Sequence, residues 1–452
     1  MLVLLALAGL LRLLVERRSI AGVTQDSLIY IRLTPHAPFA PFSPSRPSGY
    51  PLIMRLLGLL PGRDLLDIVT AAQHAAGVAV GAMVYLLSVR AGVRRSLALV
   101  AAGITLVDAH TVALEQVILA ETFFTLTLVA SVFLVVNGRF GTPAVAASGL
   151  LLGLACLIRT VGLFVVPVWL AWVVLGRFGR RAVLAGLAGV VVPVLAYCTL
   201  HAAEGAGFSI VQSDGWYLYA KVAPVADCAG ASIPEETRPL CAGARGMPFE
   251  FYLYDAASPP FRLFHGGRGM DLEEAVTPHN NRLLRQFSLG VIRAHPVPFL
   301  REVVKEFVRY LGPTTAQNEL SLYPEEGSVL AWYERTFHLD WWMVVAAFAG
   351  GVALVIVGRR SREAGLLVGT AAALVLGAAA TSGFNSRYLL PALPLLAPTL
   401  TLALEEASGW YRSRRERVSR AGPSGGGRRR PGARSPRSRT SRRPGGCASR
   451  PA

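Results

Sequence analysis

The sequence predicts an all-α polytopic membrane protein with about ten transmembrane helices and a mixed extracytoplasmic loop domain. Of its 452 residues, 53% are hydrophobic and 16% are charged, whereas soluble domains contain about 25% charged residues. Apolar runs of roughly the length needed to cross ~30 Å of hydrocarbon recur along the chain. The short loops between these runs alternate between arginine-rich and arginine-poor. Together these observations exclude an ordinary soluble enzyme.

Nine apolar runs and one shorter run at the N-terminus are predicted to span the membrane. They lie at residues 2–15, 65–89, 98–114, 123–136, 144–158, 163–175, 182–200, 341–357, 365–380 and 389–404. The first run is interrupted by Arg12 and lacks the basic region of a secretory signal. We interpret it as the outer part of a first helix, and whether the N-terminus is complete is left open.

Basic loops predict the orientation of these helices, because loops rich in lysine and arginine remain in the cytoplasm. The arginines that define them are Arg90, Arg94, Arg95, Arg139, Arg177, Arg180, Arg181, Arg359, Arg360 and Arg362. Placing their loops inside puts both termini in the cytoplasm of a multi-pass plasma-membrane protein. Arg17 and Arg18 oppose this orientation locally and are outnumbered.

The same orientation divides the chain into four parts. They are a transmembrane module at 1–202 with a first outer loop at 16–62, an extracytoplasmic domain at 203–340, transmembrane helices at 341–410 and a cytoplasmic tail at 411–452. The first outer loop is proline-rich and short on regular pattern. Within the second outer segment, the apolar spacing over 295–311 predicts an amphipathic helix rather than a span, and whether it lies on the membrane surface is left open.

The net charge of +17 comes mostly from the tail. The tail contains 14 arginines and one glutamate, and it lacks the apolar periodicity of a folded core. We interpret it as a solvated anchor on anionic lipid, and nucleic acid is not an expected partner.

The five cysteines suggest one disulfide. Cys156 and Cys198 fall in apolar runs and are expected in the core, and Cys447 lies in the tail. Cys228 and Cys241 share one polar segment, and they are able to bond if that segment is outside the cytoplasm. Whether they are bonded is left open.

Ionisable residues near hydrocarbon are costly, so each requires an explanation. With this orientation, all of them fall toward the outer face: Asp26, Asp108, Glu115, Glu121, Arg159 and Arg387. The simplest explanation is that they mark helix ends or reach the lipid headgroups. Glu121 is the exception, since an apolar run follows it directly, so its carboxylate needs a partner such as Arg159 or Arg387. His74 is interpreted as a packed polar residue.

Taken in order, these motifs resemble the GT-C membrane glycosyltransferases, particularly the family 39-like enzymes that include protein O-mannosyltransferases and the lipid A aminoarabinose transferase. The matching pieces are Asp26 followed by Pro-Ser-Gly-Tyr-Pro-Leu at 47–52, Gln-His-Ala-Ala-Gly at 73–77, Glu115 to Glu121, Gly-Leu-Ala-Cys-Leu-Ile-Arg at 153–159, and Arg-Tyr-Leu-Leu-Pro at 387–391. The likeness covers the layout of roughly residues 1–405.

The resemblance implies an enzyme that transfers a sugar from a polyprenyl-phosphate donor to an acceptor hydroxyl on the extracytoplasmic face. It implies Asp26 as the general base, and Arg159 and Arg387 as groups that bind phosphate. It further implies substrate-binding roles for Glu115, Glu121 and Tyr388. Many relatives carry an acidic pair in the first loop, whereas Asp26 is flanked by Gln25 and Ser27.

Two other classes of function stay open at this stage. One is a transporter of an envelope precursor, although paired repeats with broken helices are not found. The other is a non-catalytic membrane scaffold. A divalent cation is an open question because related enzymes differ, and the residues show no metal-binding motif. The sugar, the acceptor and the oligomeric state are not predicted.

Overall fold

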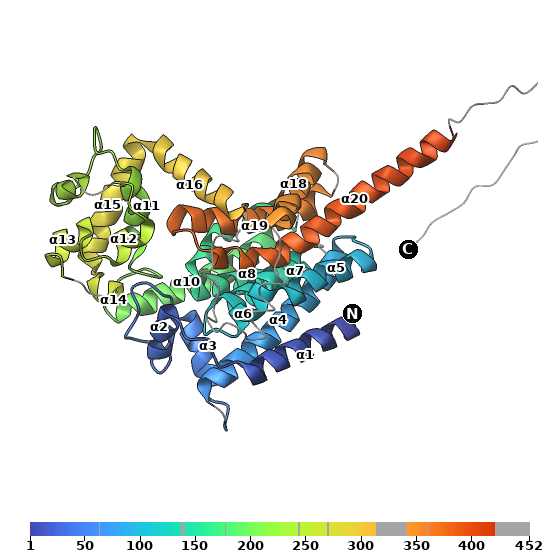
Figure 1. Ribbon diagram of the computed structural model, residues 1–452, viewed down its shortest axis with the longest axis horizontal. Coiled ribbons are helices and arrows are strands. Elements are labelled where there is room, and N and C mark those ends of the chain that lie inside the picture. The colour runs from blue at the N-terminus through green and yellow to red at the C-terminus, as the bar shows by residue number, and fades with distance from the viewer. Residues whose placement is uncertain are drawn as a thin grey trace, which may run out of the picture. The chain divides into compact units, whose positions relative to one another are not determined.

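The structure is a computed structural model, and it confirms the helical membrane fold (Figure 1). It describes residues 1–62, 64–136, 141–176, 178–242, 245–268, 271–312, 341–358 and 360–420. Of the described residues, 77% are helical, and they contain no strand apart from an isolated bridge between Gly22 and Val117. Met1–Ala407 form one compact unit, and Ser408–Ala452 form a second.

Each of the ten predicted apolar runs is helical. The corresponding elements are α1 (Leu2–Arg18), α4 (Leu65–Arg90), α5 (Arg95–Val107), α6 (Ala109–Glu115), α7 (Glu121–Val135), α8 (Gly141–Ile158), η1 (Thr160–Phe164), α9 (Val165–Leu175), α10 (Arg180–Ala203), α18 (Trp341–Val357), α19 (Ser361–Thr381), η6 (Ser386–Tyr388), η7 (Leu390–Ala392) and α20 (Leu393–Arg420).

Fewer of these helices are long enough to cross a bilayer alone. In the described ranges, five helices have the required length and hydropathy, and α5 with α6 makes a sixth if the bent pair is one span. Three further apolar helices, Glu121–Val135, Thr160–Leu175 and Trp341–Val357, are shorter. A helix of 15 residues such as α7 is only about 22 Å long, so these need flanking residues to complete a crossing.

The run predicted as one helix over 98–114 is instead two helices that meet at an angle of 50°. Asp108 ends α5 with an extended backbone, and its carboxylate accepts hydrogen bonds from the backbone and hydroxyl of Thr111. This is an N-cap that starts α6 in a new direction. A capping aspartate inside an apolar run therefore changes the path of the chain.

The proline-rich first outer loop contains two helices that its composition did not predict, α2 (Gln25–Leu33) and α3 (Gly49–Leu57). Thr24 and Ser27 form a capping box that fixes the start of α2. The Tyr30 ring of α2 meets the Tyr50 ring of α3 edge to face at 4.8 Å. The loop is therefore an ordered platform.

The second outer segment forms a small helical lobe. Its elements, which we call the loop lobe (residues 214–294), are α11 (Asp214–Val222), η2 (Ala223–Val225), η3 (Glu235–Ala242), α12 (Phe249–Tyr254), α13 (Pro259–His265), α14 (Leu272–Ala275) and α15 (Pro278–Ala294). Trp216, Tyr219 and Phe287 form part of its separate core. Cys228 and Cys241 are joined in a disulfide, which settles the question left open by the sequence.

After the loop lobe, α16 (Pro296–Tyr310) returns the chain toward the membrane helices and packs against α19. It agrees with the amphipathic helix predicted over 295–311. Several residues used to predict the orientation lie outside the described residues, namely Arg139, Arg177, Arg359 and the tail from 421 onward, including Cys447.

Candidate functional site

Asp26 lies in the first turn of α2 and is held between two arginines from distant parts of the chain. Its Oδ1 accepts a hydrogen bond of 2.6 Å from Nη2 of Arg46, and its Oδ2 accepts one of 2.6 Å from Nη2 of Arg387. Arg46 belongs to the first outer loop, whereas Arg387 lies in η6 near the C-terminal helix. Both oxygens of the carboxylate therefore have a cationic partner.

A second carboxylate, Glu121, lies at the start of α7 with a side chain that is 1% exposed. It forms an ion pair with Arg159, and its Oε1 is 3.6 Å from Nε of Arg387. Arg387 therefore bridges Asp26 and Glu121. The prediction that the Glu121 carboxylate needs an arginine partner is met by both arginines proposed for it.

Three arginines face two carboxylates in this cluster, which gives it a net charge of +1. The Tyr388 ring lies beside it, with its centroid 5.2 Å from Cζ of Arg159 and 5.4 Å from Cζ of Arg387. Guanidinium groups are attracted to such rings. The arrangement suits an anion better than a divalent cation, because arginines already occupy both carboxylates.

The acidity of Asp26 follows from these neighbours. Burial by itself acts to raise its pKa, but the charges and hydrogen bonds of Arg46 and Arg387 outweigh burial and hold the pKa of Asp26 well below its ordinary value. Asp26 is therefore ionised at neutral pH, and it remains a weak base while both arginines contact it.

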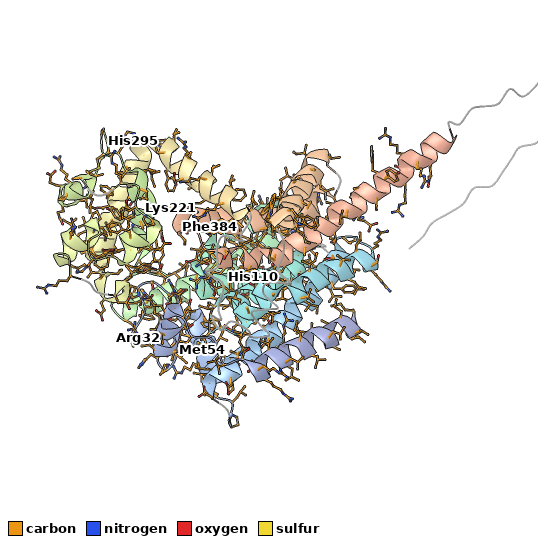
Figure 2. All side chains as sticks on the ribbon, in the orientation of Figure 1. Arg32, Met54, His110, Lys221, His295 and Phe384 are labelled. Carbon is orange, nitrogen blue, oxygen red and sulfur yellow. A yellow bond between two sulfur atoms is a disulfide. The ribbon has the colours of Figure 1, made fainter. Side chains whose placement is uncertain are left out.

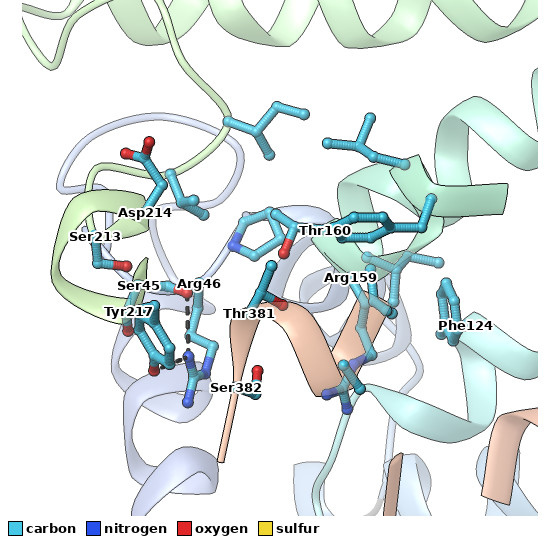
Figure 3. Close-up of a pocket in the computed structure, with 18 of the residues that line it drawn as sticks. Ser45, Arg46, Phe124, Arg159, Thr160, Ser213, Asp214, Tyr217, Thr381 and Ser382 are labelled. Carbon is cyan, nitrogen blue, oxygen red and sulfur yellow. Dashed lines mark hydrogen bonds between the residues drawn. The ribbon is translucent and has the colours of Figure 1, made fainter. Parts of the chain in front are cut away.

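The three arginines of the cluster, Asp26 and Tyr388 line a cavity of about 580 Å³ (Figure 3), whereas Glu121 lies behind its arginine partners and is not among the lining residues. One part of its wall is apolar and comes from the membrane helices: Phe124, Ile158, Leu163, Phe164, Val194, Leu195, Leu374 and Ala378. The opposite part is polar and comes from the first outer loop and the loop lobe: Ser45, Arg46, Ser213, Asp214, Tyr217 and Arg285. Figure 3 shows Arg46 and Tyr217 across the cavity from Phe124 and Arg159.

Glu115 is not part of this cluster. Its carboxylate is 1% exposed, accepts two hydrogen bonds from Arg12 at 2.7 and 2.8 Å, and contacts Nδ1 of His74 at 2.9 Å. It does not line the cavity. On one continuous helix, Glu115 and Glu121 would be about 9 Å apart along the axis. Instead α6 ends at Glu115 and α7 begins at Glu121, so the two side chains belong to different clusters.

The segment between these helices is held by Gln73, whose side-chain nitrogen donates to the carbonyls of Glu115 and Val117. His74 contacts Gln116 through Nε2 at 2.7 Å. Both polar residues of the 73–77 motif thus stabilise the turn that leads into Glu121, and His74 is packed as predicted. Asp108 is a helix cap.

Two residues that contact the site carried little signal in the sequence. Arg46 is a single arginine in a proline-rich loop, and its importance depends on the fold of that loop. Tyr217 accepts a hydrogen bond of 3.2 Å from Nη1 of Arg46. The sequence suggested that the cluster at 216–219 packs within its domain, and all four residues do so. Tyr217 and Leu218 also line the cavity.

Metal binding has no support in the geometry of the cluster. No group of three or more histidine, cysteine, aspartate or glutamate side chains suited to a metal ion occurs in the part of the chain that the structure describes. Asp26 and Glu121 are directed at arginines.

The family model for dolichyl-phosphate-mannose-protein mannosyltransferases matches residues 70–211. The predicted resemblance is confirmed. The match to this mannosyltransferase family runs from α4 to the residues after α10, so it includes Glu115, Glu121 and Arg159. Asp26, Arg387 and Tyr388 lie outside it. The family is one of glycosyltransferases.

Solved structures give distant similarities, and no curated protein matches. An S. cerevisiae protein O-mannosyltransferase complex, Pmt1-Pmt2, bound to its sugar donor, is 16% identical over 49% of this chain and 36% of that one, with a TM-score of 0.36. The Archaeoglobus fulgidus oligosaccharyltransferase AglB is 15% identical over 94% of this chain and 52% of that one, with a TM-score of 0.43. ArnT from Cupriavidus metallidurans, bound to undecaprenyl phosphate, is 14% identical over 88% of this chain and 77% of that one, with a TM-score of 0.36. This chain thus spans about a third of the length of the yeast chain and about half of the length of the archaeal chain.

Proposed function

We propose that the protein transfers a sugar from a polyprenyl-phosphate donor to an acceptor hydroxyl on the extracytoplasmic face, with Asp26 as the general base. The observation that carries this proposal is the cavity whose wall contains Asp26 and the three arginines, with Glu121 paired to two of those arginines. The match to a glycosyltransferase family supports it.

The charge of the cluster fits the proposed donor. A sugar on a polyprenyl phosphate is a phosphodiester with one negative charge, and the cluster carries a net charge of +1. Arginine is suited to phosphate because its planar guanidinium donates several hydrogen bonds in a fixed geometry. When the sugar leaves, the phosphate gains a second negative charge, which Arg159 and Arg387 stabilise.

The two walls of the cavity suit the two substrates. The apolar wall is continuous with the membrane helices, so an isoprenoid chain is able to bind there without exposing hydrocarbon to water. The polar wall contains the ion pair of Asp214 and Arg285, whose side chains are 43% and 48% exposed. This side is open to a hydrophilic acceptor, which then meets the donor near Asp26.

The reaction balances without a further reactant. Asp26 takes the proton of the acceptor hydroxyl while the acceptor oxygen forms a bond to the anomeric carbon. The bond from that carbon to the phosphate oxygen breaks, and the polyprenyl phosphate leaves. Because the donor phosphate competes with Asp26 for Arg46 and Arg387, donor binding frees an oxygen of Asp26 and raises its basicity.

The proposed orientation also has support. A disulfide between Cys228 and Cys241 is typical of an oxidising compartment. This agrees with the arginine-rich loops on the opposite side of the membrane helices.

The decisive experiment compares wild type with Asp26→Asn, using a radiolabelled polyprenyl-phosphate sugar and native envelope acceptors. Transfer is expected to fall by about 10²- to 10⁴-fold. Binding of the donor is expected to be retained or strengthened, because removing the negative charge leaves the three arginines with one carboxylate. Asp227→Asn is the matched control, since Asp227 is exposed and contacts only the local backbone at Ala229.

Three outcomes contradict parts of this proposal. Transfer that persists in Asp26→Asn eliminates Asp26 as the base. Loss of both transfer and donor binding makes Asp26 a structural residue. Absence of transfer by folded wild type, from every donor tested, favours transport of an envelope precursor or a scaffold.

A further inference from the structure

One side of α16 presents apolar residues that no other part of the described chain covers. Val297, Leu300, Val304 and Val308 are 71%, 57%, 57% and 57% exposed. They recur at intervals of three and four residues, so they form one stripe along the helix. A stripe of this length in water is unfavourable, because each aliphatic side chain would remain hydrated.

The opposite side of α16 is fixed to the membrane helices. Val303 and Tyr310 are buried in the same core as residues of α19, and the Phe307 ring lies 6.0 Å from the Phe348 ring of α18. Glu306 lies 4.0 Å from Lys221 of α11. The helix is thus fixed at the junction of the loop lobe and the membrane helices, and Figure 2 labels Lys221 and Phe384 beside it.

Basic residues follow the edge of the apolar stripe. Arg301 and Lys305 are exposed and each lies one position after a stripe residue, so each is about 100° around the helix from it. Lys305 is 70% exposed and 3.3 Å from Glu302. The outward side of α16 therefore combines aliphatic residues with cations, and its two glutamates turn toward the protein.

We propose that α16 lies in the headgroup layer of the leaflet on the Asp26 side, with its aliphatic stripe in the acyl boundary and Arg301 and Lys305 on anionic phosphates. An exposed aliphatic stripe edged by cations is the pattern of interfacial helices. Long basic side chains extend to headgroups while their stems cover hydrocarbon. Continuity with α18 and α19 places lipid, rather than another protein, against this side.

This surface has a direct route to the candidate active site. The Tyr310 ring at the end of α16 lies 4.4 Å from the Phe384 ring, and its hydroxyl accepts a hydrogen bond of 3.4 Å from the backbone of Asn385. Asn385 caps the turn that carries Arg387, because its side-chain oxygen accepts a hydrogen bond of 3.1 Å from the backbone nitrogen of Arg387. A helix seated in lipid would therefore hold Arg387 at a fixed depth.

The test places an environment-sensitive fluorophore at Val304→Cys in the full chain with Cys447→Ser, reconstituted in lipid nanodiscs. Quenching is measured with a spin label carried near the lipid headgroup and with a quencher soluble in water. The matched control is Gln286→Cys on α15, which is exposed but belongs to the loop lobe. We expect the lipid quencher to act at least roughly twofold more strongly at position 304 than at 286.

A second arm tests the charges. Phosphatidylglycerol is expected to increase lipid quenching at position 304 relative to phosphatidylcholine alone, and the change Arg301→Gln with Lys305→Gln is expected to remove that increase. Equal access of the water-soluble quencher to positions 304 and 286 would overturn the proposal. Protection from water without quenching by lipid would also overturn it, since a protein partner would then cover the helix. Neither measurement depends on enzyme activity.

Discussion

At the scale of single residues, the cluster shows how a carboxylate can be both buried and ionised. Asp26 and Glu121 are tolerated near hydrocarbon because Arg46, Arg159 and Arg387 compensate their charge. The same arginines give the cluster its excess of positive charge. The site is therefore prepared for an anion before any substrate arrives.

Arg387→Lys tests the bridge between the two carboxylates. A lysine ammonium keeps the charge but lacks the fork that contacts Asp26 and Glu121 together. Donor affinity is expected to fall about 10- to 100-fold, the effect of losing one charge-assisted hydrogen bond of roughly 1.5–3 kcal/mol. Equilibrium binding of the labelled donor measures this. Arg285→Lys is the control, because its pair with Asp214 is half exposed; an equal loss in both variants would contradict a special role for Arg387.

The pH dependence of transfer tests the environment of Asp26. Its depressed pKa keeps it ionised, so the acid limb of kcat/KM that reports this carboxylate lies at a lower pH than for an ordinary aspartate. Arg46→Gln removes one of the two cations that lower the pKa of Asp26, so the pKa rises and activity begins to fall at a higher pH. Arg32→Gln, with a side chain 61% exposed, is the control. An acid limb that does not move in Arg46→Gln would contradict this cause.

At the scale of elements, the turn between α6 and α7 determines which acidic residue pairs with the arginines of the cavity wall. A break of only five residues between two helices leaves no signature in hydropathy. The turn forms because Gln73 donates to two of its carbonyls. Local periodicity does not encode a hydrogen bond between a side chain and a backbone group 40 or more residues away. It does encode the membrane spans, because a helix in hydrocarbon requires a long apolar run.

Other site residues were predicted for a different reason. Asp26, Glu121, Arg159 and Arg387 were recognisable because charge beside an apolar run is costly and therefore informative. Arg46 lies in a loop where an arginine is unremarkable. Its role depends on the capping box that starts α2 and on the path of the prolines after it.

Glu115→Gln separates the structural role of Glu115 from the predicted substrate role. Breaking its buried pair with Arg12 is expected to lower stability by about 3–5 kcal/mol, measured as a fall in the thermal unfolding midpoint in detergent. The KM values for donor and acceptor in the protein that remains folded are expected to match wild type. A raised KM in folded protein would support substrate binding instead. Changing both partners to Met should recover part of the stability.

Gly77→Ala tests the packing of α4 against the same carboxylate. A Cβ at position 77 would overlap the carboxylate of Glu115, so the unfolding free energy is expected to fall by about 1–3 kcal/mol. Gly103→Ala on α5 is the matched control, because nothing lies within 4 Å of its added Cβ. There alanine is expected to be neutral or stabilising by up to about 1 kcal/mol. Equal unfolding midpoints for the two variants would contradict the predicted overlap.

At the scale of the whole molecule, two separate cores are combined. The membrane helices share one large core, and the loop lobe has its own aromatic core and disulfide. The cavity lies where they meet, with walls from both. Its chemistry therefore requires the loop lobe and the membrane helices together.

Labelling with a membrane-impermeant maleimide tests the proposed sidedness, in a Cys447→Ser background. Arg262→Cys on the loop lobe is expected to react in intact cells, and Arg95→Cys at the start of α5 only after permeabilisation. Both positions are exposed, and the remaining free cysteines, Cys156 and Cys198, are buried. The reverse pattern would place the Asp26 cavity in the cytoplasm.

The distance along the chain between Asp26 and Arg387 has a consequence for biosynthesis. The two residues are 361 positions apart, so ribosomes complete α2 long before they make η6. Until then, Asp26 and Glu121 lack a shared cation, and the arginine cluster is incomplete. Under the function proposed above, a nascent or truncated chain would therefore not consume lipid-linked sugar before its last helices enter the membrane.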